Sequence, residues 1–368
     1  MWCRLLPRAF ALTVLVAGCG DSSPQPHVVV HAGESIQAAL SLQPPTMDSW
    51  IVKVEAGVYH ETVSVDRSGV TLLGEVKGDG AEERAVLDGT VEAGRLLKDA
   101  VIVSGANFTM QGFTVRNYSG NGVTTSKTHN IILRDLIADH SGRYGVYPVE
   151  SQDILVENCV ATGISDAGIY VGQSRRATVR GCHVYGNVAG IEIENTVDAV
   201  VENNEANDNT AGLLAFVLPN NPSKVGQNCT MRNNNVHENN RKNWGDPTAI
   251  VSKIPAGIGV AVMAADGTVV ENNQITGNRS VGVALIGLSQ LLPDPTGIDV
   301  DPDPDGTVLR NNTYKGNGKD PDPGLKGAGF SGGGDILWDG KGKTNCIAEP
   351  QGDDLAKVGV AGALVGCK

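Results

Sequence analysis

One short unit recurs along the middle of this chain at an almost constant spacing. Between about Gly112 and Asn204 the unit occurs four times, and each copy holds a glycine followed by a short apolar stretch. These glycines are Gly122, Gly145, Gly168 and Gly190, and they lie 23, 23 and 22 residues apart. A fixed period of this length, with β-rich segments and Gly/Asn corners, is typical of a stacked solenoid.

The length of the unit decides between the repeat folds. Each unit has room for three short strands and three corners, whereas propeller blades need about 40 residues and leucine-rich repeats need a Leu-x-x-Leu-x-Leu frame. Parallel strands that follow one another in a sheet take right-handed crossovers. The 47 glycines and the aromatic content of 4% suit a narrow core of Val, Ile, Leu and Ala and argue against a helical bundle. We therefore predict an all-β fold, a right-handed parallel β-helix.

The sequence also predicts how the ends of the solenoid are capped and which residues form its corners. Apolar residues at helical spacing between Glu34 and Leu42 predict a short N-terminal capping helix, and the apolar tail from Val358 to Val365 is the candidate C-terminal cap. Asparagine recurs at the ends of the units, where we expect left-handed bends and amides stacked along the axis. These residues are Asn158, Asn203, Asn233, Asn272 and Asn311.

The N-terminus carries a targeting segment. Residues 1–18 combine basic residues with a short apolar run and predict a signal peptide. The run ends Leu-Val-Ala-Gly-Cys19, which resembles the bacterial lipobox and predicts lipidation of Cys19; the alternative is an ordinary signal peptide. Residues 19–27 then form a tether, and residues 28–368 form the β-helix domain. We expect a protein anchored in the bacterial cell envelope by this lipid alone, on the periplasmic side or the outer-membrane surface.

Charge and cysteines restrict the remaining possibilities. The formal net charge of -12 excludes a nucleic-acid partner, because phosphate binding needs a basic face. Cys159 and Cys182 occupy the same place in successive units and predict a buried thiol ladder, with a disulfide as the less favoured alternative. Cys346 and Cys367 are close enough in sequence to join the C-terminal end by a disulfide.

Strand alternation identifies the outward side chains that follow each repeat glycine. Successive residues of a strand face opposite sides of the sheet, so the apolar alternate positions face the core and their neighbours face outward. The outward positions form a Tyr/Glu strip, and aromatic rings beside carboxylates suit a sugar chain. The candidate substrate-binding residues are Tyr147, Tyr170, Glu150, Glu192, Glu194 and Phe216. The alternative is a solvated sheet face without a ligand.

Two further patterns bear on chemistry. Tyr144, Glu192, Glu194 and His140 are the candidate catalytic residues, because they are the titratable groups on or beside the strip. The acidic run Asp301-Pro-Asp303-Pro-Asp305-Gly has the alternating acids of a calcium loop and makes Ca²⁺ a candidate cofactor. Its twelfth position is Asn312 instead of the bidentate Glu of an EF-hand, so an acidic surface insertion is the alternative.

Several segments resemble those of known β-helix proteins. The order from Ser35-Ile-Gln-Ala-Ala-Leu through Gly57-Val-Tyr-His-Glu is similar to the opening turns of pectin-lyase-like β-helices. The segments Tyr144-Gly-Val-Tyr-Pro-Val-Glu, Asp166-Ala-Gly-Ile-Tyr-Val-Gly and Ala189-Gly-Ile-Glu-Ile-Glu-Asn resemble an uncharacterised family of exported bacterial β-helix lipoproteins. This resemblance implies fold, export and a second exported protein, encoded nearby, as a partner. It implies no reaction.

A more distant resemblance concerns the segment from Arg143 to Glu150. It is similar to the catalytic segment of the mannuronan C-5 epimerases, in which Tyr-Gly-Phe-Asp-Pro-His is followed by an acid. Tyr144, Gly145, Pro148 and Glu150 match, whereas the family's Asp and His fall at Tyr147 and Val149. We therefore expect a carbohydrate-binding or scaffold protein that presents the strip to a polysaccharide. The alternative is a polysaccharide-modifying enzyme (lyase, C-5 epimerase or glycoside hydrolase) with a non-standard active site.

Overall fold

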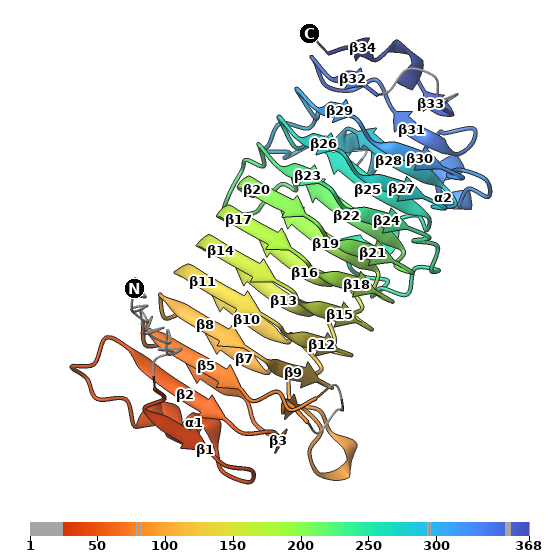
Figure 1. Ribbon diagram of the computed structural model, residues 1–368. Coiled ribbons are helices and arrows are strands. Elements are labelled where there is room, and N and C mark those ends of the chain that lie inside the picture. Colours follow the sequence, from red (N-terminus) through yellow and green to blue (C-terminus); the bar gives the residue numbers. More distant parts are fainter. Residues whose placement is uncertain are drawn as a thin grey trace, which may run out of the picture.

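A computed structural model describes residues 25–78, 80, 83–292, 294, 296–349 and 355–367. The predicted signal peptide, the lipidation site Cys19 and most of the tether lie outside these residues and stay predictions. Over the described ranges the chain winds into one elongated coil whose strands form three parallel sheets of 13, 11 and 10 strands (Figure 1). The fold predicted from the repeat, an all-β parallel β-helix, is confirmed.

Each complete turn of the coil gives one strand to each sheet. The 13-stranded sheet contains β1 (Val28–Val30), β2 (Trp50–Val54), β5 (Val70–Gly74), β8 (Phe108–Gln111), β11 (His129–Arg134), β14 (Gln152–Glu157), β17 (Arg175–Arg180), β20 (Val197–Glu202), β23 (Thr230–Arg232), β26 (Val269–Glu271), β29 (Val308–Arg310), β32 (Cys346–Ala348) and β34 (Val365–Gly366). The 11-stranded sheet contains β4 (Val63–Val65), β7 (Val101–Val103), β10 (Val123–Ser126), β13 (Tyr144–Val149), β16 (Ala167–Gly172), β19 (Ala189–Glu194), β22 (Ala211–Phe216), β25 (Ile258–Met263), β28 (Val281–Ile286), β31 (Gly334–Trp338) and β33 (Lys357–Gly359). The 10-stranded sheet contains β3 (Gly57–Tyr59), β6 (Ala85–Asp88), β9 (Phe113–Arg116), β12 (Ile137–Asp139), β15 (Val160–Thr162), β18 (His183–Tyr185), β21 (Glu205–Asn207), β24 (Asn235–His237), β27 (Gln274–Thr276) and β30 (Thr313–Lys315).

The core is a stack of equivalent side chains. Val146, Ile169, Ile191 and Leu213 pair in register on β13, β16, β19 and β22, and all four are fully buried. Parallel strands stack about 4.8 Å apart, so each rung places its apolar side chain directly on the one below. Cys159 and Cys182 are free, buried thiols in successive rungs, as predicted.

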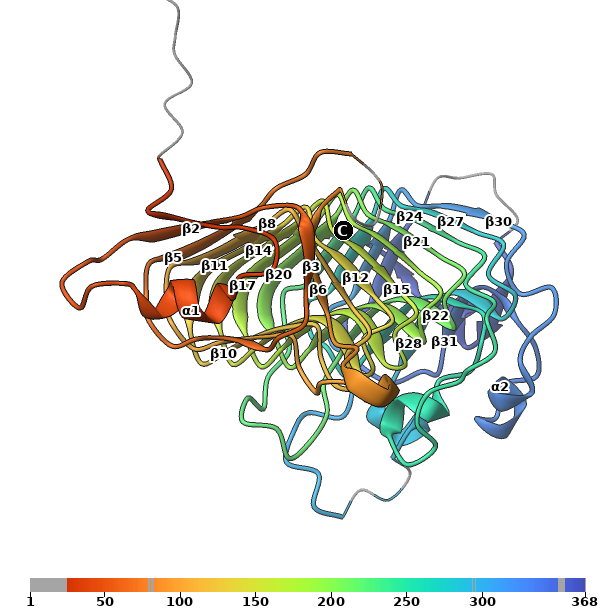
Figure 2. The ribbon, with the colours of Figure 1, turned by 90° about the horizontal axis from the view of Figure 1, so that it is seen from below.

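Both ends of the coil are closed. At the N-terminal end, helix α1 (Ile36–Ser41) buries Ile36 and Leu40, and the Ser35 side chain caps it by accepting from the Ala38 N–H (Figure 2). This is the predicted capping helix. His27 stacks on Trp50, so the fold begins within the last residues of the expected tether.

The predicted C-terminal tail also takes part in the fold. It supplies β33, the 3₁₀ helix η4 (Ala361–Ala363) and β34, with Ala361 and Leu364 buried. A disulfide joins Cys346 to Cys367 and fixes this end, which confirms the pairing suggested by the sequence.

Asparagine plays two roles at the corners, and the expected assignment was partly wrong. The five predicted corner residues have left-handed φ values between 54° and 56°, as expected. The stacked amides, however, belong to the next residue in the chain, because the left-handed residue turns its side chain outward and its successor faces inward. This ladder joins Asn204, Asn234, Asn273 and Asn312 by Nδ2-to-Oδ1 bonds of 3.0, 2.9 and 2.9 Å. A second ladder joins Asn187, Asn209, Asn239, Asn278 and Asn317.

Four insertions leave the regular coil after β22, β24, β28 and β30. They carry the 3₁₀ helices η2 (Ile250–Lys253) and η3 (Leu288–Gln290) and the short helix α2 (Pro323–Gly327), whereas η1 (Glu92–Gly94) belongs to an earlier loop. The excursions gather on one side of the coil, beside the 11-stranded sheet (Figure 2). No helix in the described part of the chain is long and apolar enough to cross a membrane.

Candidate functional site

A cavity of about 580 Å³ lies between the outer face of the 11-stranded sheet and the insertions. Its floor is the predicted Tyr/Glu strip, but the strip is not a surface. Tyr170, Glu192 and Glu194 are only 4%, 4% and 8% exposed, because η2, η3 and α2 lie over the outer columns of the sheet. The expectation that the whole strip is exposed was therefore wrong, and these residues line a partly covered cleft.

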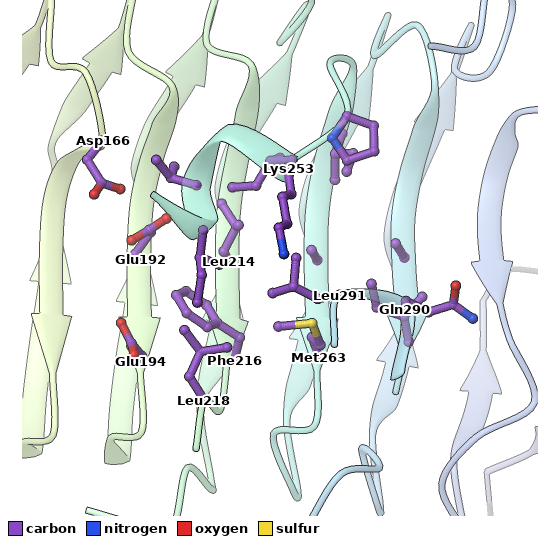
Figure 3. A pocket seen from close by; sticks show the side chains of 18 of the residues that line it. Asp166, Glu192, Glu194, Leu214, Phe216, Leu218, Lys253, Met263, Gln290 and Leu291 are labelled. Carbon is purple, nitrogen blue, oxygen red and sulfur yellow. The ribbon is translucent and has the colours of Figure 1, made fainter. Parts of the chain in front are cut away.

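The columns themselves follow the predicted register. Tyr170 pairs with Glu192 and Glu192 with Leu214, while Glu194 lies between Gly172 and Phe216. The carboxyl groups of Glu192 and Glu194 consequently point to the same side of the sheet, two residues apart on β19 (Figure 3).

Three tyrosines form one wall at this end of the cavity. The rings of Tyr144 and Tyr147 are nearly parallel with centroids 4.4 Å apart, and the Tyr170 ring lies 4.8 and 5.0 Å from them. The Arg143 guanidinium lies 5.3 Å from the Tyr144 ring centroid. Burial raises the pKa of Tyr144 and Tyr170, so both hydroxyls stay protonated and can donate hydrogen bonds.

Gly172 determines how Tyr170 lies. A Cβ atom at Gly172 would sit 2.2 Å from the Tyr170 ring, so only glycine lets that ring lie along the strand. In this position the Tyr170 hydroxyl donates to Glu194 Oε2 at 2.7 Å and accepts from Gln173 Nε2 at 3.0 Å. Asn221, from the insertion after β22, donates to Glu194 Oε1 at 2.6 Å. Both oxygens of Glu194 are therefore engaged.

Glu192 is placed differently from its neighbour. Within the described residues its buried carboxyl group has no hydrogen-bond partner, and it lies at the same end of the cavity as Asp166 and Glu194 (Figure 3). The Asp166 carboxylate Oδ2 lies 3.6 Å from Arg143 Nε. We call this group, Asp166, Glu192 and Glu194 together with the three tyrosines, the carboxyl end of the cavity.

Burial raises the pKa of all three carboxyl groups. The pKa of Asp166 is partly restored by Tyr144 and Arg143, and that of Glu194 by its bonds from Tyr170 and Asn221. For Glu192 the charges of Asp166 and Glu194 add to the effect of burial on the pKa, and the charge of Arg143 opposes them. Glu192 is therefore the carboxyl group that most favours the protonated form.

These raised pKa values predict a pH-dependent stability. Between the ordinary carboxyl pKa, about 4.3, and the raised values, the folded chain binds more protons than the unfolded chain. The free energy of unfolding should thus be greatest below this window and fall as pH rises through it. Glu192→Gln should flatten the profile, whereas Glu238→Gln, whose side chain is 74% exposed, should not. Urea unfolding at several pH values measures this, and identical profiles for wild type and Glu192→Gln would contradict it.

The structure gathers most of the predicted site residues in the cavity. Those that line it are Tyr144, Tyr147, Tyr170, Glu192, Glu194 and Phe216. His140 and Glu150 do not line it, so the structure does not bring them together with the other candidates. Each is a corner residue with left-handed φ, 51° and 47°, which turns its side chain away from the cavity. His140 contacts Asp139 in a separate hollow beside Trp244, and Glu150 lies 3.9 Å from Lys127.

Sequence reasoning missed Asp166, Arg143, Gln173 and Asn221. Arg143 and Asp166 immediately precede β13 and β16, whose first residues, Tyr144 and Ala167, are paired. They therefore occupy the same corner of successive rungs, and a charged pair at one repeat position was the available signal. Asn221 comes from an irregular insertion, for which periodicity gives no signal.

The expected calcium loop lacks the geometry of a metal site. The described residues contain no group of three or more His, Cys, Asp or Glu side chains that could hold a metal ion. The Asp301 carboxylate accepts from the Asp303 N–H at 3.2 Å, and the Asp305 carboxylate accepts from the Lys343 N–H at 2.7 Å. Asp301 and Asp305 thus accept backbone N–H groups, and the assignment of Asp301, Asp303 and Asp305 to one metal stays a prediction without support from this geometry.

Comparison with known proteins decides the fold. A family profile described as "Right handed beta helix region" matches residues 99–240. The A-module of mannuronan C-5 epimerase AlgE4 from Azotobacter vinelandii aligns with a TM-score of 0.54 and 19% identity, over 88% of this chain and 94% of that one. The chain has the pectin-lyase-like right-handed β-helix fold.

Other solved structures show the same fold. Alginate lyase from Paenibacillus sp. str. FPU-7 aligns with a TM-score of 0.53 and 14% identity, over 86% of this chain and 99% of that one. DFA-IIIase from Arthrobacter chlorophenolicus A6 aligns with a TM-score of 0.56 and 10% identity, over 86% and 88%. No curated protein matches the sequence significantly. At these identities the likeness concerns the fold, and function must be argued from the site.

Proposed function

We propose that the cavity binds a neutral carbohydrate and that its carboxyl end hydrolyses a glycosidic bond. The observation that carries the proposal is Glu192, 4% exposed and without a hydrogen bond from any described residue, at the same end of the cavity as Asp166, whose Oδ2 lies 3.6 Å from Arg143 Nε. Two carboxyl groups in different environments are the arrangement that glycoside hydrolysis uses.

The walls of the carboxyl end suit a sugar. Tyr144, Tyr147 and Tyr170 offer ring faces for the C–H surface of a pyranose or furanose and hydroxyls for its oxygens. The structural neighbours include an epimerase named for mannuronan and a lyase named for alginate, both polysaccharides. These neighbours support a carbohydrate as the ligand, but they do not indicate which reaction takes place.

The charge of the site favours a neutral sugar over a uronate. Three carboxyl groups line this end, and Arg143, which supplies the positive charge there, is already paired with Asp166. A substrate carboxylate would be repelled unless all three groups were protonated. The Asp and His of the epimerase segment are replaced by Tyr147 and Val149, which removes the groups for proton transfer at C5. Epimerase and lyase chemistry are therefore less favoured than hydrolysis.

We assign a role in hydrolysis to each of the three carboxyl groups from the side chains that surround it. Glu192 donates its proton to the glycosidic oxygen as the bond to the anomeric carbon breaks. In its ionised form, which the nearby Arg143 favours, Asp166 stabilises the positive charge on the sugar and takes a proton from the water whose oxygen bonds to that carbon. Glu194, with both oxygens engaged by Tyr170 and Asn221, orients the sugar. The site is restored when the proton taken up by Asp166 passes to Glu192, directly or through solvent that accepts one proton from Asp166 and gives one to Glu192.

A panel of glycans with product analysis tests the proposal. We expect the protein to release reducing ends from a neutral glycan, such as a glucan, xylan, mannan or fructan, and to leave alginate and polygalacturonate unbound and intact. Binding of a glycan that is recovered intact would replace hydrolysis by carbohydrate binding alone. Unsaturated products from a uronate polymer would contradict the charge argument and favour a lyase.

A further inference from the structure

The chemistry of the cavity changes between two neighbouring rungs. In one outward column Glu192 on β19 is followed by Leu214 on β22, and in the next column Glu194 is followed by Phe216. Both changes from a carboxyl group to an apolar side chain occur across a single strand spacing of about 4.8 Å. The two halves of the cavity therefore meet at a sharp boundary (Figure 3).

Beyond this boundary the lining is apolar almost throughout. The sheet contributes Leu214, Phe216, Ala261, Met263, Ala284, Ile286 and Leu337, and the insertions contribute Val251, Ile254, Leu291, Leu325 and Phe330. Lys253 and Gln290 are the polar side chains nearest to them, and Figure 3 shows Lys253 reaching from η2 toward Met263 and Leu291. We call this half the apolar end.

The apolar end is more than a hydrophobic cluster under the insertions. The insertions do not pack down onto the sheet here, and they leave a partly open cleft of about 580 Å³ that spans both ends. In the column that begins with Leu214, the next two residues are Ala261 and Ala284. Their short side chains leave room above the sheet at the apolar end. Clefts lined mainly by apolar side chains favour ligands with apolar parts.

The extent of the apolar end indicates the shape of its occupant. From β22 to β31 the floor spans three strand spacings, or about 14 Å along the axis. A sugar would lose the hydration of its hydroxyls there without finding partners, at a substantial cost in free energy. A linear hydrocarbon chain would fill the same space and gain from burial.

We propose that the ligand of this cavity is an amphiphilic glycoside, with its sugar at the carboxyl end and a hydrocarbon chain along the apolar end. The inference rests on the proposed function for the sugar half and adds the class of the aglycone. The glycosidic oxygen then lies at the boundary, next to Glu192, where a proton is needed.

Binding of matched glycosides to the full chain tests this inference. The probes are the methyl and octyl glycosides of glucose, galactose, mannose and fructose, each below its micelle concentration, with octanol as the chain alone. We expect the octyl glycoside of at least one sugar to bind about tenfold or more tightly than its methyl counterpart and more tightly than octanol. Ala261→Phe, which fills the apolar end, should bring the octyl-to-methyl ratio toward one, and a circular dichroism melt checks its fold.

The outcomes separate the two proposals. Equal affinity for methyl and octyl glycosides would overturn the amphiphile while leaving carbohydrate binding intact. Octanol binding as tightly as the octyl glycosides, or no binding of any glycoside, would overturn the sugar half and with it the proposed function. If Ala261→Phe fails to fold, the affinities of the wild-type chain for the methyl glycosides, the octyl glycosides and octanol still test the proposal.

Discussion

Glu192→Gln is expected to abolish most of the hydrolytic activity while leaving the fold unchanged. Glutamine has the shape of glutamic acid but no proton to donate, and general acid catalysis contributes about 10²–10⁴-fold to such rates. Because the Glu192 carboxyl makes no hydrogen bond in the described structure, the amide breaks no existing contact. The measurement is kcat/KM for release of reducing ends from the glycan that the panel identifies.

A change of leaving group shows whether Glu192 acts as the acid. Nitrophenol leaves without help from a proton, so a nitrophenyl glycoside should lose much less rate in Glu192→Gln than the natural glycan does. Glu238→Gln is the control, since its exposed side chain lies on a corner outside the cavity. An equal loss on both substrates would assign Glu192 to binding, and an unchanged rate on the glycan would remove it from the mechanism.

The substitution Glu194→Gln should affect the protein differently from Glu192→Gln. The Glu194 carboxyl group accepts hydrogen bonds from Tyr170 and Asn221, so the substitution places an amide N–H against a donor on one side. We argue that it disturbs the position of Tyr170 and therefore the affinity for the sugar. Under the proposed mechanism the two glutamates of β19 have separate roles, which follow from their hydrogen-bond partners because both side chains are buried.

The fold could be predicted because a strict repeat leaves little freedom. Once Ile169 and Ile191 face the core, alternation directs Tyr170 and Glu192 to the other side, whatever else the chain does. The corners were less predictable, since a left-handed residue breaks the alternation. His140 and Glu150 were misplaced for this reason, and the amide ladder was assigned to Asn203 and its equivalents instead of their successors.

The enclosure of the site could not be predicted from the sequence. It depends on where four irregular insertions fold back, and neither periodicity nor turn residues determine that. Asn221 reaches Glu194 from one such insertion, and η2 and α2 cover the apolar end from two others. The consequence is chemical: the same carboxyl groups on an exposed face would titrate near their ordinary pKa, whereas beneath the insertions their pKa is raised.

Asn234→Ala is expected to destabilise the chain by about 3–5 kcal/mol, the largest effect on stability that we predict. Asn234 Oδ1 accepts from the backbone N–H and from Nδ2 of Asn204, both at 3.0 Å. Its own Nδ2 donates to the Val201 carbonyl and to Asn273 Oδ1, both at 2.9 Å. Alanine removes all four bonds in a fully buried corner, and unsatisfied buried groups cost about 1–3 kcal/mol each.

The neighbouring Asn235 is the matched control for this experiment. Its side chain is exposed on β24, so Asn235→Ala should change the free energy of unfolding by no more than about 0.5 kcal/mol. Urea unfolding measures both variants, and hydrogen exchange should show lost protection centred on the rungs of Asn204 and Asn273, since a solenoid rung contacts only its neighbours. Equal stabilities for the two variants would mean that the ladder adds nothing beyond the sheets. In chain order Asn204 lies between β19 and β22 and Asn234 lies between β22 and β25, so a loosened ladder should disturb the boundary between the carboxyl and apolar ends before it disturbs either cap.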